Sequence, residues 1–270
     1  MQLALWQTKG NPSNVPANLA ALEATAQSAA AAGAAILLCP ECWLGGYNIG
    51  AAIPEVAEAR NGPSAQRIAQ IARTHQLAIA YGYAELGAPE GRIYNSLQVI
   101  AADGQPLAHY RKTHLFGPQE RAAYVPGACF EPPFELAGLR FGLLICFDVE
   151  YPEAVRSLAL MGAEVILVST ALTDEYAAVP DFIVPARSLE NQVFIAYCNH
   201  AGVENGMRFL GRSCLTGLDG KALAAAGAGE ALIVGEINHG TRERSAQTYP
   251  YREGRRPELY GLVSRPVLGQ

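Results

Sequence analysis

The sequence contains no apolar run long enough to span a membrane, and residues 1–6 lack the basic region, apolar stretch and cleavage site of a secretory signal. It also lacks a basic run before the C-terminal tail, and 20 Lys and Arg against 25 Asp and Glu give a net charge of −5. These absences argue against a membrane partner and a nucleic-acid surface. We therefore expect a cytoplasmic, soluble protein that acts on a small molecule.

Two kinds of motif are also missing. No Gly-x-Gly-x-x-Gly or phosphate-loop pattern follows a predicted strand, which argues against dinucleotide binding. The pair Cys39 and Cys42 leaves open a redox dithiol or half a metal site, but no second Cys or His pair lies at ligand spacing. A redox pair normally opens a helix, whereas the residues after Cys42 are typical of a loop.

No segment of the 270 residues is rich enough in Ser, Gly, Pro or like charge to form a linker, so we expect a single domain over residues 1–270. Half of the residues are apolar, and their spacing alternates between strand and helix periods. The pattern predicts an α/β domain whose sheets are covered by helices. Predicted strands cover residues 2–7, 35–39, 78–85, 93–101, 106–111, 141–145, 165–169, 193–199, 213–217 and 231–236, and predicted helices cover 14–32, 64–75, 152–161 and 181–191.

Cys146 lies where the apolar run 141–145 ends and a polar stretch begins. A cysteine retained for packing more often lies inside such a run, whereas one at the carboxyl end of a strand can meet a substrate. Two other predicted strand ends carry Glu41 and Lys112. A thiol with a pKa of about 8.5 needs a base or a positive neighbour near neutrality, and these two residues supply both. The three side chains are sufficient for acyl transfer.

The motifs around these residues resemble the nitrilase, or carbon–nitrogen hydrolase, superfamily. Three segments match the catalytic motifs of that family in order: 40–47, 110–116 and 146–153. Further matches extend over nearly the whole chain, at 94–96, 126–127, 187–191 and 255–260. The resemblance implies a four-layer α-β-β-α sandwich, no metal or organic cofactor, and homodimers that often assemble further. In such a fold the C-terminal tail, residues 241–270, would cross the subunit interface.

The resemblance also implies roles for individual residues. Glu41 would take the proton of the Cys146 thiol and later activate water, while Lys112 would stabilise the oxyanion together with the backbone amide of Phe147. The thiol would attack an amide, release ammonia and leave a thioester that water opens. A fourth position of the family falls on Glu120, which would orient Lys112 or the substrate. An exposed acid paired with its neighbour in the loop is the alternative for Glu120.

Residues near Glu41, Lys112 and Cys146 indicate the kind of substrate. Many family members that act on carboxylate-bearing amides have Arg four positions after the nucleophile, where this chain has Glu150. A carboxylate there would favour a substrate with a distant ammonium, although Glu150 could instead form an ion pair with Arg156. Asp174 and Glu175 could add to this negative end. Tyr47 and Phe147 would form its walls.

The whole-chain pattern most resembles bacterial amidases that hydrolyse 5-aminovaleramide and the related stereoselective amino-amide amidases. An N-carbamoyl amidohydrolase and an ω-amidase are alternatives within the superfamily. Outside it, a papain-like hydrolase would pair Cys146 with His200, although the chain order argues against this. A non-catalytic regulatory role is a further alternative, because a fold does not fix an activity. The loop 172–180 matches no pattern.

Overall fold

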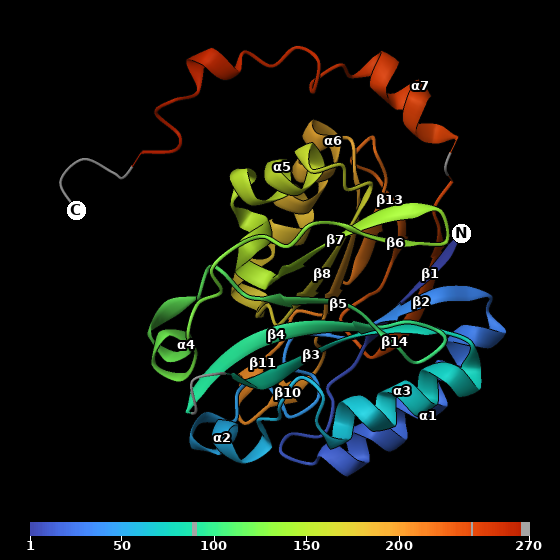
Figure 1. Cartoon of the computed structure of the whole chain (residues 1–270), viewed down its shortest axis with the longest axis vertical. Helices are drawn as coiled ribbons and strands as arrows, with labels where there is room; N and C mark the ends of the chain where they lie inside the picture. The colour runs from blue at the N-terminus through green and yellow to red at the C-terminus, as the bar shows by residue number, and fades with distance from the viewer. Residues whose placement is uncertain (88–90, 239, 266–270) are drawn as a thin grey trace.

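The structure, a computed structural model, describes residues 1–87, 91–238 and 240–265. Two six-stranded sheets face each other, and helices cover both outer faces (Figure 1). The first sheet contains, in spatial order, β14 (Ala231–Glu236), β1 (Gln2–Gln7), β2 (Ala34–Leu38), β3 (Ala78–Gly87), β4 (Arg92–Ile100) and β5 (Pro106–Arg111). The second contains β13 (Ala222–Ala225), β12 (Cys214–Thr216), β9 (Phe194–Asn199), β8 (Val165–Thr170), β7 (Leu139–Ile145) and β6 (Phe134–Leu136). The expected four-layer α-β-β-α sandwich is confirmed.

Both sheets combine a parallel centre with antiparallel edges. Strands β1, β2 and β3 are parallel, as are β7, β8 and β9, while the strands outside them are paired antiparallel. The parallel strands read as continuous apolar runs because both of their faces are covered. This is why the sequence pattern identified them.

Side chains alternate between two packing layers along each strand of the first sheet. Leu3 and Leu5 of β1 point to the layer between the sheets, whereas Ala4 packs under the helices α1 (Val15–Ala31) and α3 (Pro63–His75). Helices α5 (Pro152–Leu160) and α6 (Val184–Asn191) cover the second sheet with buried residues such as Leu158 and Val184. Strands β2 and β7 are therefore packed on both faces up to their carboxyl ends.

The two sheets are joined by hydrogen bonds at the rim where the parallel strands end. The amide of Glu41 donates to the carbonyl of Thr170 at 3.3 Å, and the Ser169 hydroxyl donates to the carbonyl of Cys39 at 3.0 Å. Gly82 of β3 allows the chain to pass closely here, because a Cβ at this position would lie 2.9 Å from Cα of Glu41 and 2.6 Å from the nearest backbone atoms. The segment with Glu41 is thus fixed by backbone contacts on both sides.

The predicted elements are present with ends that differ by at most two residues, apart from the helix 181–191. That segment begins with a π-helical turn, Val179–Ile183, and α6 starts at Val184. The loop 172–180 contains the 3-10 turn Asp174–Tyr176. The short elements were not predicted, because each has too few residues to show a period. They are β6, β13, β10 (Val203–Glu204), β11 (Met207–Arg208), α2 (Ile53–Val56), α4 (Gly117–Ala123) and α7 (Thr241–Thr248).

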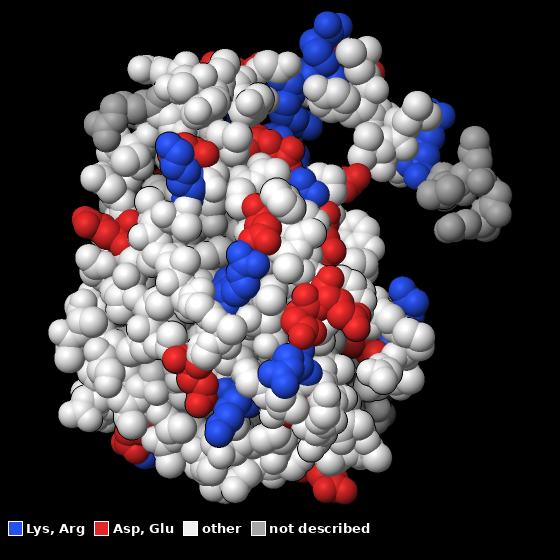
Figure 2. All heavy atoms as spheres, turned by 180° about the vertical axis from the view of Figure 1, so that it is seen from behind, with Lys and Arg blue, Asp and Glu red and all other residues white. Residues whose placement is uncertain are grey.

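The surface carries both signs of charge. On the face shown in Figure 2, basic and acidic residues are interspersed over the body of the molecule. The described part of the tail leaves the body after α7 (Figure 1). It exposes apolar side chains such as Leu259 and Leu262. Its expected place at a subunit interface stays a prediction. No helix in the described ranges is long and apolar enough to cross a membrane.

Candidate active site

Three strand ends bring Glu41, Lys112 and Cys146 to one buried centre. Glu41 follows β2, Lys112 follows β5 and Cys146 follows β7. The ammonium Nζ of Lys112 lies 2.7 Å from Oε1 of Glu41, and Cys146 is close enough for both charges to act on its thiol. Glu41 and Lys112 have no exposed surface, and Cys146 is 7% exposed. The structure therefore assembles the three residues that the sequence singled out.

Cys146 occupies a sharp turn between β7 and the 3-10 helix Cys146–Glu150, labelled η2. Its φ of +48° is in the left-handed region, which is unfavourable for a side chain with a Cβ. Backbone strain of this kind persists only where the surrounding structure enforces it, and it is concentrated at functional positions. The turn presents the thiol at the carboxyl edge of the sheet.

Lys112 is held between two carboxylates. Its Nζ donates to Oε1 of Glu41 and to Oε1 of Glu120, each at 2.7 Å. Glu120 is 4% exposed in helix α4, and it also accepts hydrogen bonds from the Tyr47 hydroxyl at 2.7 Å and the Phe116 amide at 2.8 Å. Glu120 is therefore a buried partner of Lys112. The alternative, in which it is an exposed acid paired with the neighbouring arginine, is wrong.

Burial sets the protonation states at this centre. It raises the pKa of the Glu41 carboxyl to about 7, a rise that the nearby Lys112 ammonium limits. Burial, with Glu41 adding to it, also raises the pKa of the Cys146 thiol above its ordinary value. Burial alone would lower the pKa of Lys112, but Glu41, Cys146 and Glu120 raise it well above its usual range. Near neutral pH the resting site thus holds a neutral thiol and a charged ammonium.

Glu41 has one carboxylate oxygen available for proton transfer. Oε1 accepts from Lys112 and from the Asn95 amide at 2.7 Å. Oε2 is buried and has no hydrogen-bond partner among the described residues. A buried carboxylate oxygen without a donor is costly unless a substrate, water or thiol hydrogen fills the position. Asn95 lies in segment 94–96, which resembles the family, but no pattern in the sequence indicated its role.

Asp148 is a fully buried carboxylate in η2 that sequence reasoning missed. Its Oδ2 accepts from the Ile145 amide at 3.1 Å and the Tyr110 hydroxyl at 2.9 Å. Its Oδ1 accepts from the Thr113 hydroxyl at 2.9 Å and from the amide and ring Nδ1 of His114 at 2.9 and 2.8 Å. One carboxylate therefore ties the turn after β7 to the segment after β5. No spacing in the sequence indicates this link.

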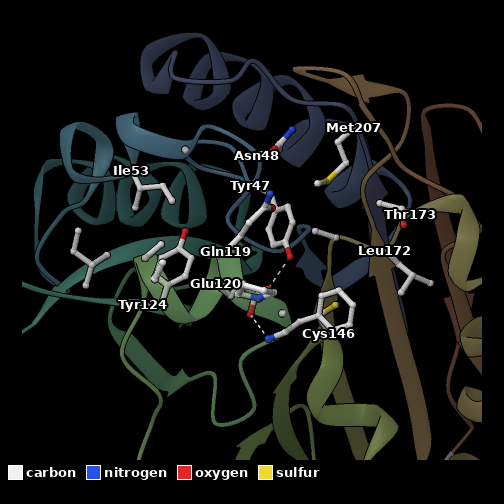
Figure 3. A pocket seen from close by; sticks show the side chains of 18 of the residues that line it. Tyr47, Asn48, Ile53, Gln119, Glu120, Tyr124, Cys146, Leu172, Thr173 and Met207 are labelled. Atoms are coloured by element: carbon white, nitrogen blue, oxygen red, sulfur yellow. Dashed lines mark hydrogen bonds between the residues drawn. The ribbon is translucent and has the colours of Figure 1, made fainter.

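A cavity of about 850 Å³ opens at the thiol (Figure 3). Its wall is mostly apolar, and Glu120 is the charged residue among the described residues that line it. Tyr47, Glu120 and Cys146 point into it, and the Tyr47–Glu120 hydrogen bond is drawn as a dashed line in Figure 3. The wall also contains Phe116, whose ring packs edge-on against Phe147 at 5.2 Å.

Of the residues expected to contact the substrate, some line the cavity and others do not. Tyr47 lines the cavity, and Phe147 supports its wall through Phe116. Glu150 is half-buried at the end of η2, outside the lining. Its backbone carbonyl accepts from Arg187 at 2.8 Å, and the ion pairs of the described residues include none between Glu150 and Arg156.

The structure does not bring Asp174 and Glu175 to the cavity wall. Thr173 and Tyr176 line the cavity on either side of them, but the 3-10 turn directs Asp174 and Glu175 toward solvent, where both are exposed. Residues three apart lie on the same side of a 3-10 turn, so Thr173 and Tyr176 reach the cavity while the two residues between them do not. The sequence pattern did not predict this turn.

The hairpin of β10 and β11 supplies a further wall that the sequence did not reveal. Met207 lines the cavity, and Phe209 packs edge-on against Tyr47 at 6.2 Å between ring centroids. The Glu204 carboxylate accepts a hydrogen bond from the Asn48 amide, which anchors the loop with Tyr47. Two-residue strands give too short a pattern to be identified from sequence.

The structure gives His200 a different partner from that expected of a catalytic base. His200 is buried, and its Nε2 donates to the backbone carbonyl of Glu41 at 2.7 Å while its ring stacks on Phe209 at 4.9 Å. Burial lowers the pKa of His200 to about 4, so the ring is neutral near pH 7. The geometry makes it a support for Glu41.

No disulfide bond joins Cys39 and Cys42. Cys39 and Cys42 are free and buried, and burial raises the pKa of both thiols. The Cys42 sulfur lies 3.5 Å from the Tyr124 hydroxyl. In the ranges that the structure describes, no three His, Cys, Asp or Glu residues are grouped as metal ligands.

The sequence comparisons agree with this geometry. A carbon–nitrogen hydrolase family model matches residues 2–247. The chain is 45% identical over 266 residues to a hydrolase encoded in the pqqF 5′ region of Pseudomonas protegens, covering 98% of this chain and 92% of that protein. It is 35% identical over 262 residues to an (R)-stereoselective amidase of a Pseudomonas species, covering 97% and 93%. The chain belongs to the carbon–nitrogen hydrolase family.

Solved structures give the same result. An amidase from a Nesterenkonia species superimposes with a TM-score of 0.88 at 32% identity, covering 97% of this chain and 96% of that one. A cysteine-to-alanine variant of the Nesterenkonia sp. AN1 amidase in complex with butyramide gives 0.87 at 33% identity, covering 96% and 95%. The protein is a hydrolase of carbon–nitrogen bonds, of the amidase type.

The first prediction concerns Asp148 as a positioning residue. Asp148→Asn keeps the shape but turns an NH2 group toward hydrogen-bond donors, so we expect kcat to fall about tenfold to a hundredfold. KM should change much less, because the cavity wall is intact. The measurement is steady-state release of ammonia from a primary amide, with urea unfolding of the same samples.

The matched control is Asp103→Asn, since Asp103 accepts a backbone hydrogen bond from Gln105 in an exposed turn. It should leave kcat at the wild-type value. A purely structural role for Asp148 would lower the unfolding midpoint and leave the kcat of the folded fraction unchanged, which would contradict the prediction.

Proposed function

We propose that this amidase hydrolyses small aliphatic amides through a thioester on Cys146. Glu41 Oε2 takes the thiol proton as the sulfur attacks the carbonyl carbon. The oxyanion that forms is stabilised by the Lys112 ammonium and the Phe147 amide. When the C–N bond breaks, Glu41 returns the proton to the leaving nitrogen, and ammonia departs.

Water completes the cycle in our proposal. Glu41 removes a proton from a water molecule, which attacks the thioester, and the second oxyanion forms at the same position. The carbon–sulfur bond then breaks, the proton passes from Glu41 to the sulfur, and the acid is released. Glu120 keeps Lys112 in place throughout. One observation carries this proposal: Lys112 bridges Glu41 and Glu120 at 2.7 Å each, beside a thiol on a strained turn.

Work on a similar protein supports the covalent step. In the Nesterenkonia sp. AN1 amidase, acrylamide and the acetamide moiety of fluoroacetamide are attached to the active site cysteine of a glutamate-to-glutamine variant. The same protein binds butyramide when that cysteine is replaced by alanine. These observations belong to that amidase, and we extend the covalent chemistry to Cys146 by proposal.

The cavity favours uncharged or cationic amides over anionic ones. The described residues that line it include Glu120 but no arginine or lysine. A substrate with a free carboxylate would lose its hydration without gaining a positive partner. This argues against the ω-amidase and carbamoyl alternatives whose substrates carry a carboxylate, although a 2-oxoglutaramate amidase of Bacillus subtilis is 30% identical over 226 residues.

We further propose that ω-amino amides such as 5-aminovaleramide are among the substrates. The support is Glu150, a half-buried carboxylate one turn after Cys146, on which Lys112 acts electrostatically. Burial raises the pKa of Glu150, and Lys112 and Arg187 limit this rise, but the ion pairs of the described residues supply no cation bonded to its carboxylate. An ammonium of the substrate would provide that cation.

The nucleophile is tested by covalent labelling. We expect fluoroacetamide to modify Cys146 of the native protein and Cys146→Ala to be inactive, because the thioester cannot form. Peptide mapping by mass spectrometry locates the adduct. Cys129→Ala is the matched control, since Cys129 is exposed on a loop and should be dispensable. An adduct on Cys42, or full activity of Cys146→Ala, would refute the assignment.

The base is tested by a pH profile. Glu41 must be ionised to accept a proton, and its pKa is raised to about 7. The value of kcat/KM should therefore rise with pH through about 7 and level off above it, so that it is about a hundredfold lower at pH 5 than on the plateau. Circular dichroism at each pH verifies folding. A flat profile between pH 5 and 8 would exclude Glu41 as the base.

The ammonium site is tested by a charge-neutral variant. Glu150→Gln should reduce kcat/KM for 5-aminovaleramide about tenfold to a hundredfold relative to pentanamide, since a charge-assisted hydrogen bond contributes roughly 1–3 kcal/mol. Glu153→Gln, an exposed neighbour on α5, serves as the control and should not change the ratio. An equal loss on both substrates would assign Glu150 to the scaffold.

A further inference from the structure

The cavity is larger than a small amide requires. Its volume of about 850 Å³ lies in the upper part of the 300–1,000 Å³ range that is typical of sites for much larger ligands. An amide of four or five carbons would fill a minor part of this space. The remaining volume therefore needs an explanation from its own lining.

The cavity extends to both sides of the Tyr47–Glu120 hydrogen bond. In Figure 3, Cys146 and Leu172 lie on one side of Glu120, and Ile53 and Tyr124 lie on the other. The core clusters show the same division, because Cys146 and Leu172 pack with the central core. Ile53 and Tyr124 belong to a separate small cluster. We call the part of the cavity beside Ile53, Ile93, Ala123 and Tyr124 the distal lobe.

The distal lobe is built from apolar side chains of three elements. Ile53 comes from α2, Ile93 from β4 and Ala123 from α4. The amide of Val125 donates to the carbonyl of Ile93 at 2.8 Å, which fixes the end of α4 against the strand. Tyr124 is 6% exposed, and its hydroxyl already has Cys42 as a partner at 3.5 Å. The lobe therefore offers apolar surface and little hydrogen-bonding capacity.

These features favour an apolar group as the occupant of the distal lobe. A charged group in the lobe would lose hydration, and Glu120 at its boundary is already bonded to Lys112 and Tyr47. An apolar group gains from leaving water in proportion to its buried area. Because the lobe is continuous with the space at Cys146, one molecule can occupy both.

We propose that the distal lobe is a subsite for an apolar part of the acyl chain, located several atoms from the amide that Cys146 attacks. The lobe thus adds to the substrates primary amides whose acyl chain ends in an alkyl or aryl group. The inference rests on the proposed thioester mechanism, and it is independent of Glu150, because its test uses uncharged amides.

The test compares acetamide, butyramide, hexanamide and 4-phenylbutyramide as substrates of the full chain. Once the chain reaches the lobe, each added methylene should raise kcat/KM roughly fourfold until the lobe is full. Ala123→Phe fills the lobe and should lower the ratio of kcat/KM for hexanamide to that for acetamide at least tenfold. Ala59→Phe, an exposed site outside the cavity lining, should keep the wild-type ratio.

A second variant enlarges the lobe. Ile53→Ala should move the highest kcat/KM of the series toward 4-phenylbutyramide. This variant still tests the subsite if Ala123→Phe does not fold. A flat or falling chain-length profile in the active wild-type enzyme overturns the subsite, as does an unchanged ratio in Ala123→Phe or an unchanged optimum in Ile53→Ala. Failure of the thioester mechanism gives a different result, because Cys146→Ala would then stay active while the chain-length profile is still measurable.

Discussion

The buried ammonium of Lys112 is the constraint on which the site depends. A charge with no exposed surface is strongly destabilising unless opposite charges and hydrogen bonds surround it. Glu41 and Glu120 supply both at 2.7 Å, from segments 71 residues before and 8 residues after it. Burial raises the pKa of Glu41, Lys112 limits this rise, and the second carboxylate, Glu120, adds to it. In the proposed mechanism, the burial that makes Lys112 depend on this cluster also prepares Glu41 to act as the base.

The geometry of this cluster is maintained by buried polar groups around it. Asp148 connects the turn of Cys146 to the segment after Lys112, and His200 supports the backbone of Glu41. Glu204 anchors the loop that carries Tyr47. A satisfied polar network of this kind fixes positions more strictly than apolar packing does. Such precision is needed because catalytic groups act over hydrogen-bond distances.

The same centre lies in an apolar cavity that is wider than the reaction itself requires. The reactive groups occur at one end, and much of the remaining wall comes from α2, α4, the β10–β11 hairpin and neighbouring loops, with Ile93 contributed by β4. The two sheets position the reactive side chains, and the elements outside the sheets form much of the cavity wall. Relatives with the same catalytic residues can therefore differ in substrate through these segments alone.

The sequence by itself determined the long strands and helices, because each spans enough residues to show its period, and it identified Glu41, Lys112 and Cys146 by their shared place at strand ends. The tertiary structure decided which groups meet. The roles of Asp148 and Glu204 depend on hydrogen bonds between residues 34 and 156 positions apart, and the exposure of Asp174 and Glu175 depends on a 3-10 turn. Contacts over such separations leave no local pattern, since the side chains involved are ordinary until the fold brings them together.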